Sequence, residues 1–158
     1  LLKCWNDGFK LDVSFLEDHP VKSTHENQSL SFVRRSKNNS MKISFVSDNF
    51  SNNDCFSATS PKNRYNYLAY IQKLKKVFNE AGINLSTSDI NKPDLSNAVL
   101  QYGLKVKSLK NIDKENYYLF ALESPLIDNT AISTKYHNKF NKIFTWNDDL
   151  IDDKKFLK

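Results

Sequence analysis

The stretch Tyr117-Tyr118-Leu119-Phe120-Ala121-Leu122 decides the fold of this chain. It is continuous, apolar and aromatic, with no alternation between apolar and polar residues. Such a run is typical of a central parallel strand, because a strand covered on both faces has no side that turns to water. Glu123-Ser124-Pro125 follows at once. We therefore predict a buried parallel strand that ends in a short polar turn.

Segments on both sides of this stretch alternate between strand and helix patterns. Short segments rich in β-forming residues predict further strands at residues 42–46, 83–87, 98–102 and 142–146. An apolar stripe at helical spacing predicts a helix over residues 63–81, and Gly82 stands where a left-handed cap is expected. Residues 133–139 predict a short helix, whereas residues 104–109 fit either a helix or a strand.

This alternation predicts an α/β fold, a Rossmann-like parallel sheet with flanking helices. Right-handed crossovers would place the helices on both faces of the sheet. The domain is expected over residues 41–158. Residues 5–16 could form a short strand or hairpin arm, but residues 22–29 and 34–40 are polar, so residues 1–40 are expected to be a poorly ordered or atypical lead-in. The chain starts at Leu1 and stops after an apolar pair near Lys158, so we expect a truncated sequence.

The composition of the chain limits the kinds of partner that it is expected to bind. The net charge of +5 invites a nucleic-acid interpretation, but lysines are scattered among carboxylates and arginines number only three, so no nucleic-acid partner is expected. No apolar run approaches the roughly 20 residues that cross a bilayer. We expect no transmembrane segment and a cytoplasmic location, either free or peripheral to a membrane.

Cysteines and histidines carry no metal signature. Cys4 and Cys55 are too few for a disulfide framework or a zinc site and are expected to be free thiols. His19 and His25 lack a second pair of ligands. His137 falls on the predicted short helix and is expected at the surface.

Glu123 is the candidate base. A carboxylate directly after a buried strand is presented from a rigid support, and partial desolvation would raise its pKa so that it accepts a proton from an alcohol. The alternatives are that Glu123 caps the following turn or pairs with a lysine.

Other polar and aromatic residues lie at the ends of predicted strands or just beyond them. Asp48 and Asn49 follow the first strand and would either bind hydroxyl groups or cap their own loop. Trp146 and Tyr102 would either stack on the apolar face of a sugar ring or pack in the core. The acidic pairs at residues 148–149 and 152–153 are expected to be solvated turns and not a metal site.

Two of these segments resemble a known family. Residues 118–125, which end in Glu-Ser-Pro, and residues 140–149 (Phe-Asn-Lys-Ile-Phe-Thr-Trp-Asn-Asp-Asp) resemble glycosyltransferase family 10, the α-1,3/1,4-fucosyltransferases. Members of that family have an apolar strand ending in Glu-Ser-Pro, then a segment close to Phe-(Asn/Asp)-x-x-(Leu/Phe)-Thr-(Trp/Tyr). Residues 42–48 look like the first strand of bacterial members. The resemblance covers residues 41–158.

The resemblance implies the N-terminal, acceptor-binding half of a GT-B arrangement, in which a C-terminal domain holds GDP-fucose. It implies an inverting transfer of fucose to a glycan hydroxyl, with Glu123 as the base. The residues implied to bind the acceptor are Asp48, Asn49, Ser124 and Trp146. No cofactor is implied in this chain, because GDP-fucose is the donor substrate of the whole enzyme.

The chain also departs from the family. The donor-binding domain, with its basic clamp for the leaving diphosphate, is absent, so we expect this fragment alone to be inactive. Ala121 and Leu122 stand where many members carry more polar or aromatic residues, which leaves the choice of acceptor open. One alternative is a non-catalytic carbohydrate-binding or interaction domain derived from such an enzyme. A nucleotide-binding module is disfavoured, because Gly8, Gly82 and Gly103 form no Gly-rich phosphate loop.

Overall fold

A computed structural model describes residues 40–103, 109, 112–122, 124, 126–127 and 133–158. The chain divides into two units, residues 1–35 and 36–158, and every described residue belongs to the second. The predicted lead-in, apart from Ser40, lies outside the described residues, as does most of the ambiguous segment 104–109. Both interpretations stay predictions.

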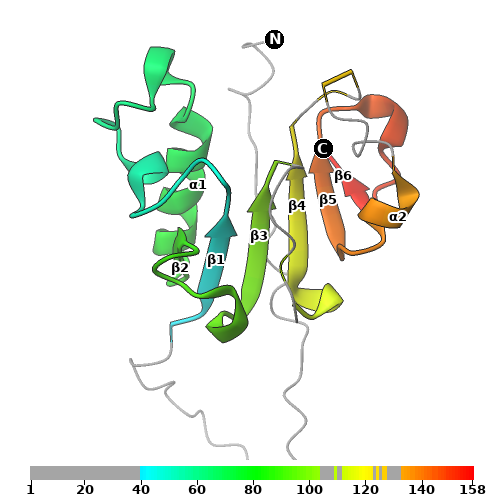
Figure 1. The fold of residues 1–158 in the computed structure, drawn as a ribbon, viewed down its shortest axis with the longest axis horizontal. Helices are drawn as coiled ribbons and strands as arrows, with labels where there is room; N and C mark the ends of the chain where they lie inside the picture. Colours follow the sequence, from blue (N-terminus) through cyan, green and yellow to red (C-terminus); the bar gives the residue numbers. More distant parts are fainter. Residues whose placement is uncertain (1–39, 104–108, 110–111, 123, 125, 128–132) are drawn as a thin grey trace, which may run out of the picture. The chain divides into compact units, whose positions relative to one another are not determined.

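The described unit is built on one sheet of six parallel strands in the order β2-β1-β3-β4-β5-β6 (Figure 1). The strands are β1 (Lys42–Val46), β2 (Asn84–Thr87), β3 (Ala98–Tyr102), β4 (Tyr117–Ala121), β5 (Lys142–Thr145) and β6 (Phe156–Leu157). The α-helices are α1 (Ala69–Glu80) and α2 (Thr134–His137). The predicted α/β fold with a Rossmann-like parallel sheet is confirmed, and β4 lies inside the sheet between β3 and β5.

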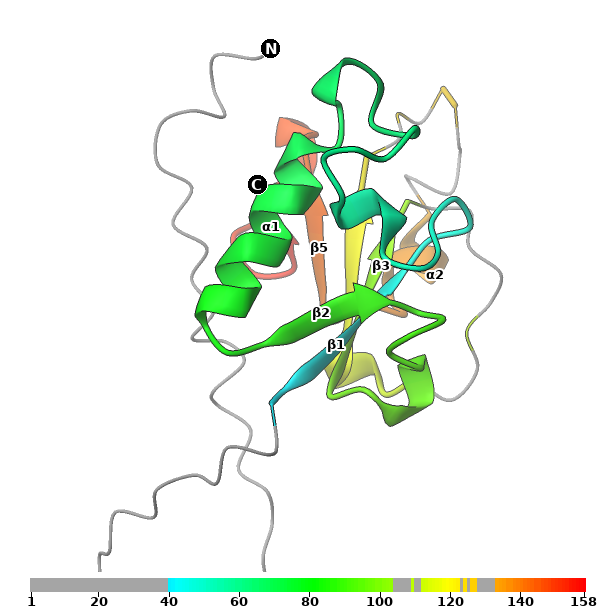
Figure 2. The ribbon, with the colours of Figure 1, turned by 90° about the vertical axis from the view of Figure 1, so that its left-hand side faces the viewer.

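The two helices cover opposite faces of the sheet. On β3, the hydroxyls of Tyr102 and of Tyr70 in α1 share a hydrogen bond, whereas Gln101 donates to the hydroxyl of Tyr136 in α2. Consecutive residues of a strand point to opposite faces. The helices therefore lie on both faces, as predicted, and Figure 2 shows α1 beside β1 and β2.

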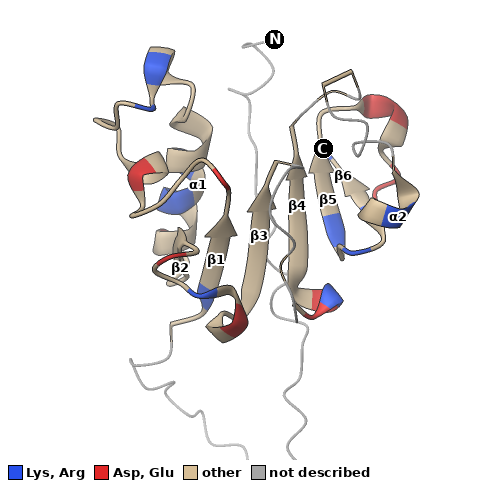
Figure 3. Ribbon diagram, in the orientation of Figure 1, with Lys and Arg blue, Asp and Glu red and all other residues tan. Residues whose placement is uncertain are grey.

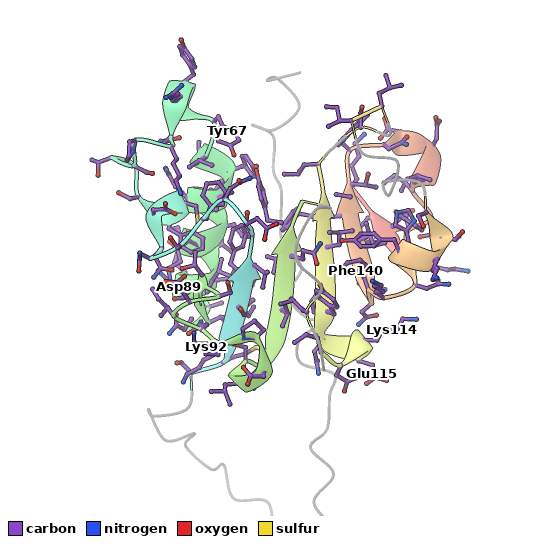
Figure 4. All side chains as sticks on the ribbon, viewed as in Figure 1. Tyr67, Asp89, Lys92, Lys114, Glu115 and Phe140 are labelled. Carbon is purple, nitrogen blue, oxygen red and sulfur yellow. The ribbon has the colours of Figure 1, made fainter. Side chains whose placement is uncertain are left out.

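The core fills both sides of the central strands. Leu119 of β4 is completely buried on the α2 face, and its neighbour Tyr118 is buried on the other face. Phe140 packs beneath α2 with its ring centroid 4.5 Å from that of Tyr117 (Figure 4). The unbroken apolar run that predicted a central strand thus reflects burial on two faces.

Helix α1 begins later than predicted. The sequence predicted a helix over residues 63–81, but a 3₁₀ turn occupies Arg64–Asn66, and α1 starts at Ala69. Tyr65 and Asn66 have left-handed φ angles of 54° and 59°. The Asn63 side chain accepts the Leu68 N–H at 3.0 Å. Asparagine competes with helical hydrogen bonding in this way, which explains the delayed start.

The C-terminus of α1 follows the prediction. Gly82 has φ +74°, its N–H donates to the Asn79 carbonyl at 3.0 Å, and the Ile83 N–H donates to the Phe78 carbonyl at 2.8 Å. These two bonds form a Schellman motif, which requires a left-handed residue after the helix.

Gly82→Ala should lower the free energy of unfolding by about 1 kcal/mol, because a side chain is strained at a left-handed φ. No atom lies within 4 Å of an added Cβ, so the loss would come from the backbone alone. Urea denaturation of the variant measures it. Asn79→Ala, at an exposed site in the last turn of the same helix, is the control and should not destabilise the protein. If Gly82→Ala and Asn79→Ala unfold with the same free energy, the left-handed φ of Gly82 does not strain an added side chain.

Strand β6 was not predicted as a strand. One Asp152 oxygen accepts backbone N–H groups from Lys154, Lys155 and Phe156 at 2.9, 2.8 and 2.8 Å. This carboxylate turns the chain so that Phe156 and Leu157 can pair with β5. A strand of two residues has no period of its own, so the sequence pattern did not reveal it.

The hydrogen bonds from Phe156, Lys154 and Lys155 lower the pKa of Asp152. A carboxyl group whose pKa is lowered by folding stabilises the protein above its unfolded pKa of about 3.9, and this contribution is lost as the pH falls through the folded value. Asp152→Asn should therefore melt below the wild type at pH 7, with the gap closing in acid. Thermal melts from pH 7 to pH 2.5 measure the gap, and a gap of constant size would exclude the charge as its cause.

His137 corrects a prediction, because it is buried and not at the surface. Its ring packs edge-on against Phe156, with 5.2 Å between ring centroids. The unpredicted strand β6 supplies this contact.

Cys55 is also buried, and burial raises the pKa of its thiol to about 12. Among the described residues, no helix is both long enough and apolar enough to cross a bilayer.

Candidate functional site at the carboxyl edge of the sheet

The carboxyl ends of all six strands lie along one edge of the sheet, because the strands are parallel (Figure 1). The chain reverses its direction of strand addition between β1 and β3, since β2 lies on one side of this pair and β4 on the other. In open α/β sheets, ligands bind at such a switch point, beyond the carboxyl ends of the strands. This edge, which we call the carboxyl edge, is the candidate site.

Asp48 and Asn49 lie in the turn directly after β1 at the switch point, and both are exposed. The Asn49 N–H donates to the Ser47 hydroxyl at 3.2 Å, and the Lys62 ammonium donates to the Asn49 carbonyl. Lys62 also forms an ion pair with Asp54 at 2.7 Å. The backbone of this turn is thus held in place, and the sequence-predicted pair presents its side chains to solvent.

Hydrogen bonds join the loop after this turn to the end of β2. Asn53 accepts the Thr87 N–H at 2.8 Å and donates its own N–H to the Thr87 hydroxyl at 3.0 Å. The Asn52 N–H donates to Asp89 at 2.9 Å (Figure 4 labels Asp89). Hydrogen bonds lower the pKa of Asp89. The one from the Thr87 side chain has the largest effect, and the one from the Asn52 N–H acts in the same direction. These hydrogen bonds were not predicted from the sequence. The only local signal is the Asn52-Asn53 pair, since asparagine is enriched at the left-handed φ angles that both residues adopt.

Tyr102 is partly buried and packs against core side chains under the switch point. Its ring centroid lies 5.5 Å from that of Phe45 and 5.8 Å from that of Phe50. Its hydroxyl bonds to that of Tyr70, and burial raises the pKa of Tyr70 to about 12 and that of Tyr102 further. Both phenols therefore stay neutral. Of the two roles considered for Tyr102, the structure supports core packing.

A buried polar network fixes the end of β3 on the opposite face. The Gln101 side-chain amide donates to the Gly103 carbonyl at 2.9 Å and to the Tyr136 hydroxyl at 2.6 Å, and it accepts from the Tyr117 hydroxyl. Burial raises the pKa of Tyr117, so its hydroxyl remains a donor. This network holds three elements together below the carboxyl edge. No local sequence pattern could have revealed it, since its members lie far apart in the chain.

Trp146 is the exposed aromatic residue of the carboxyl edge on the β5 side. It follows β5 directly, and 53% of it is exposed, so it is not a core residue. Its indole N–H donates to the Leu122 carbonyl, just past β4, at 3.0 Å. Ser124 is partly buried, and its hydroxyl accepts the Leu126 N–H at 3.2 Å. The structure therefore brings Trp146 close to the turn that begins after β4.

Glu123, the predicted base, lies outside the described residues, and only its neighbours Leu122 and Ser124 are described. Asp48 and Asn49 follow β1, which β3 and β4 separate from β5. Adjacent strands lie 4.7–4.9 Å apart, so the ends of β1 and β5 are separated by about 14 Å. The predicted acceptor-binding residues thus form two groups: Asp48 with Asn49, and Ser124 with Trp146.

Charges are interspersed along the described elements (Figure 3). Asp148 forms an ion pair with Lys158 at 2.7 Å, and Asp152 accepts backbone hydrogen bonds. Within the described ranges, no group of three or more His, Cys, Asp or Glu side chains is placed to hold a metal ion.

In comparisons with known proteins, the chain matches no family model, no curated protein and no solved structure.

Proposed function

We propose that this chain is the acceptor-binding domain of an inverting sugar transferase that moves fucose from GDP-fucose to a glycan hydroxyl, with Glu123 as the base. The observation that supports this proposal is the juxtaposition of two segments. Strand β4, which precedes Glu123, pairs with β5, and Trp146 after β5 bonds to the Leu122 carbonyl. These are the two segments that resemble family 10 fucosyltransferases.

The position of the glutamate in the chain suits a base. It follows a strand whose residue Leu119 is fully buried, and its neighbours Leu122 and Ser124 are both partly buried. A support of this kind moves little, and general-base catalysis depends on a fixed distance between the carboxylate and the hydroxyl. The carboxyl edge is also where open parallel sheets bind their ligands.

In the proposed reaction, the Glu123 carboxylate takes the proton of the acceptor hydroxyl while the hydroxyl oxygen attacks the anomeric carbon of fucose. The new carbon–oxygen bond forms as the bond to GDP breaks, and GDP leaves with the electron pair. Attack from the face opposite GDP inverts the anomeric centre. Basic groups on a second, C-terminal domain of a GT-B arrangement would stabilise the leaving diphosphate.

The test is a transfer assay on the protein with all the sequence that its gene adds beyond Lys158. GDP-fucose is supplied with a panel of glycans, the product mass is measured by mass spectrometry, and the anomeric configuration is determined by NMR. We expect a fucosylated glycan with inverted configuration. Hydrolysis of GDP-fucose without transfer, or retention of configuration, would contradict the proposal.

A second candidate is a carbohydrate-binding domain without turnover. The exposed indole of Trp146 favours it as much as it favours a transferase, because an aromatic face binds sugars whether or not a reaction follows. Saccharide binding by the full-length protein without any transfer would select this candidate.

A further inference from the structure

Three segments that carry lysines meet at the edge of the sheet opposite the candidate site. This edge, which we call the amino edge, holds the N-terminal ends of the six parallel strands. Lys114 lies in the 3₁₀ turn before β4, Lys139 lies shortly before β5, and Lys155 lies directly before β6. These three strands are neighbours, so their starts are spaced by roughly 5 Å. Figure 3 shows lysines at this end of β4 and β5, and Figure 4 labels Lys114.

Hydrogen bonds between the three segments hold the backbone that carries these lysines. The Asn141 side chain donates to the Glu115 carbonyl at 2.7 Å, and the Asn141 N–H donates to the Tyr117 carbonyl at 2.7 Å. The Ile143 N–H donates to the Lys155 carbonyl at 2.8 Å. A surface that is ordered in advance loses little conformational entropy when a ligand binds.

The ammonium group of Lys155 lies in unfavourable surroundings. Lys155 is partly buried, and its ammonium donates only a long hydrogen bond, of 3.4 Å, to the Asn138 side chain. Burial lowers the pKa of Lys155, and repulsion by Lys114 lowers it further, whereas attraction by Asp152 is too weak to offset them. In the described part of the chain, no carboxylate forms an ion pair with Lys114, Lys139 or Lys155.

The carboxylates of these segments do not neutralise the lysines. One Asp152 oxygen already accepts three backbone N–H groups. Asp113, Glu115 and Asp153 are exposed, and none of them forms an ion pair with a described residue. An anion that reached Lys155 would therefore not have to displace a bound carboxylate.

We propose that Lys114 and Lys155 bind a phosphate monoester group, carried by a soluble metabolite or by a lipid headgroup, with Lys139 beside it. A phosphate monoester carries a charge of about −1.5 to −2 at pH 7, which matches two ammonium groups, whereas a carboxylate carries a single charge. Lysine is a common phosphate ligand and acts as a point charge. The site lies at the amino edge, so it does not depend on the function proposed for the carboxyl edge.

Calorimetric titration of the full-length protein with phenyl phosphate tests the site. We expect saturable binding that Lys155→Gln weakens roughly tenfold, the scale of one charge-assisted hydrogen bond. Lys114→Gln should also weaken binding, whereas Lys155→Arg, which keeps the charge, should retain part of the affinity. Lys73→Gln is the matched control, because it removes the same charge from an exposed position on α1, and it should bind like the wild type.

The side-chain NMR signal of Lys155 gives a second measurement. Lys114→Gln should raise the pKa of Lys155, because it removes a repelling charge, and bound phenyl phosphate should raise this pKa in the wild type. Phosphatidylcholine vesicles that contain phosphatidic acid test the lipid source. If they bind through Lys155 and phenyl phosphate does not bind, the site is upheld and its ligand is a lipid headgroup.

Failure of both phenyl phosphate and the vesicles to bind would overturn the proposal. Equal losses in Lys155→Gln and Lys73→Gln would also overturn it, because they would show only a general attraction to a positively charged protein. Benzoate, a carboxylate of similar shape, should bind more weakly than phenyl phosphate, and equal affinities would reject a phosphate site. Binding of phenyl phosphate that leaves the pKa of Lys155 unchanged would place the ligand elsewhere.

Discussion

Glu123→Gln should lower kcat for fucose transfer by about two to four orders of magnitude, the usual contribution of a general base. Glutamine has nearly the shape of glutamate but cannot accept the proton of the acceptor hydroxyl at neutral pH. The affinity for GDP-fucose should stay the same, because the proposal places the donor on a second domain. Steady-state kinetics and calorimetric titration with GDP-fucose, both on the full-length protein, measure the two quantities.

Asp48→Asn provides the matched control for this variant. It removes one carboxylate from the same edge of the sheet, but from the turn after β1, which β3 separates from β4. A residue that only binds the acceptor should change KM more than kcat. If Glu123→Gln keeps the kcat of the wild type, Glu123 is not the base.

Asn91→Asp should lower the free energy of unfolding by about 2–4 kcal/mol, because one buried and one partly buried carbonyl would lose their donor. Asn91 is 6% exposed, and its side-chain amide nitrogen donates to the Ile43 carbonyl at 3.0 Å and the Asn84 carbonyl at 2.9 Å. It therefore ties β1 to β2. An ionised aspartate would place a negative charge against both carbonyl oxygens. Urea denaturation measures the loss.

Asn97→Asp is the control, because the side chain of Asn97 accepts a hydrogen bond, whereas that of Asn91 donates. Asn97 is exposed, and its side-chain oxygen accepts the Lys42 N–H at 2.8 Å. A carboxylate also accepts this bond, so the stability should change little. Equal losses in both variants would show that the donor role of Asn91 is unimportant.

The sequence predicted five of the six strands because each is a local run of β-forming residues. It failed where side chains redirect the backbone. The Asn63 side chain delays the start of α1, and the Asp152 carboxylate creates β6. His137 was misplaced for the same reason, because the strand that covers it was not foreseen.

The candidate site was predictable only in part. Because parallel strands end at one edge, the sequence could place Asp48, Asn49 and Ser124 beyond strand ends, and Trp146 as the last residue of a strand. It could not show that Trp146 bonds to Leu122, because no local period reports a contact between separate loops. The role of Glu123 stays a prediction, since this residue lies outside the described part of the chain.

The all-parallel sheet also bears on how the chain reaches its native state. Parallel neighbours cannot be joined by a tight hairpin, so each described strand must find its partner across a long intervening segment. Even the pairing closest in sequence, Ile143 with Phe156, requires a sizeable loop to close. The chain loses loop-closure entropy before the strands pair and gain their hydrogen bonds. Folding is therefore slow, and unpaired strands are exposed to aggregation in the meantime. During synthesis, β1 has to wait until β3 has been made before its neighbours on both sides exist.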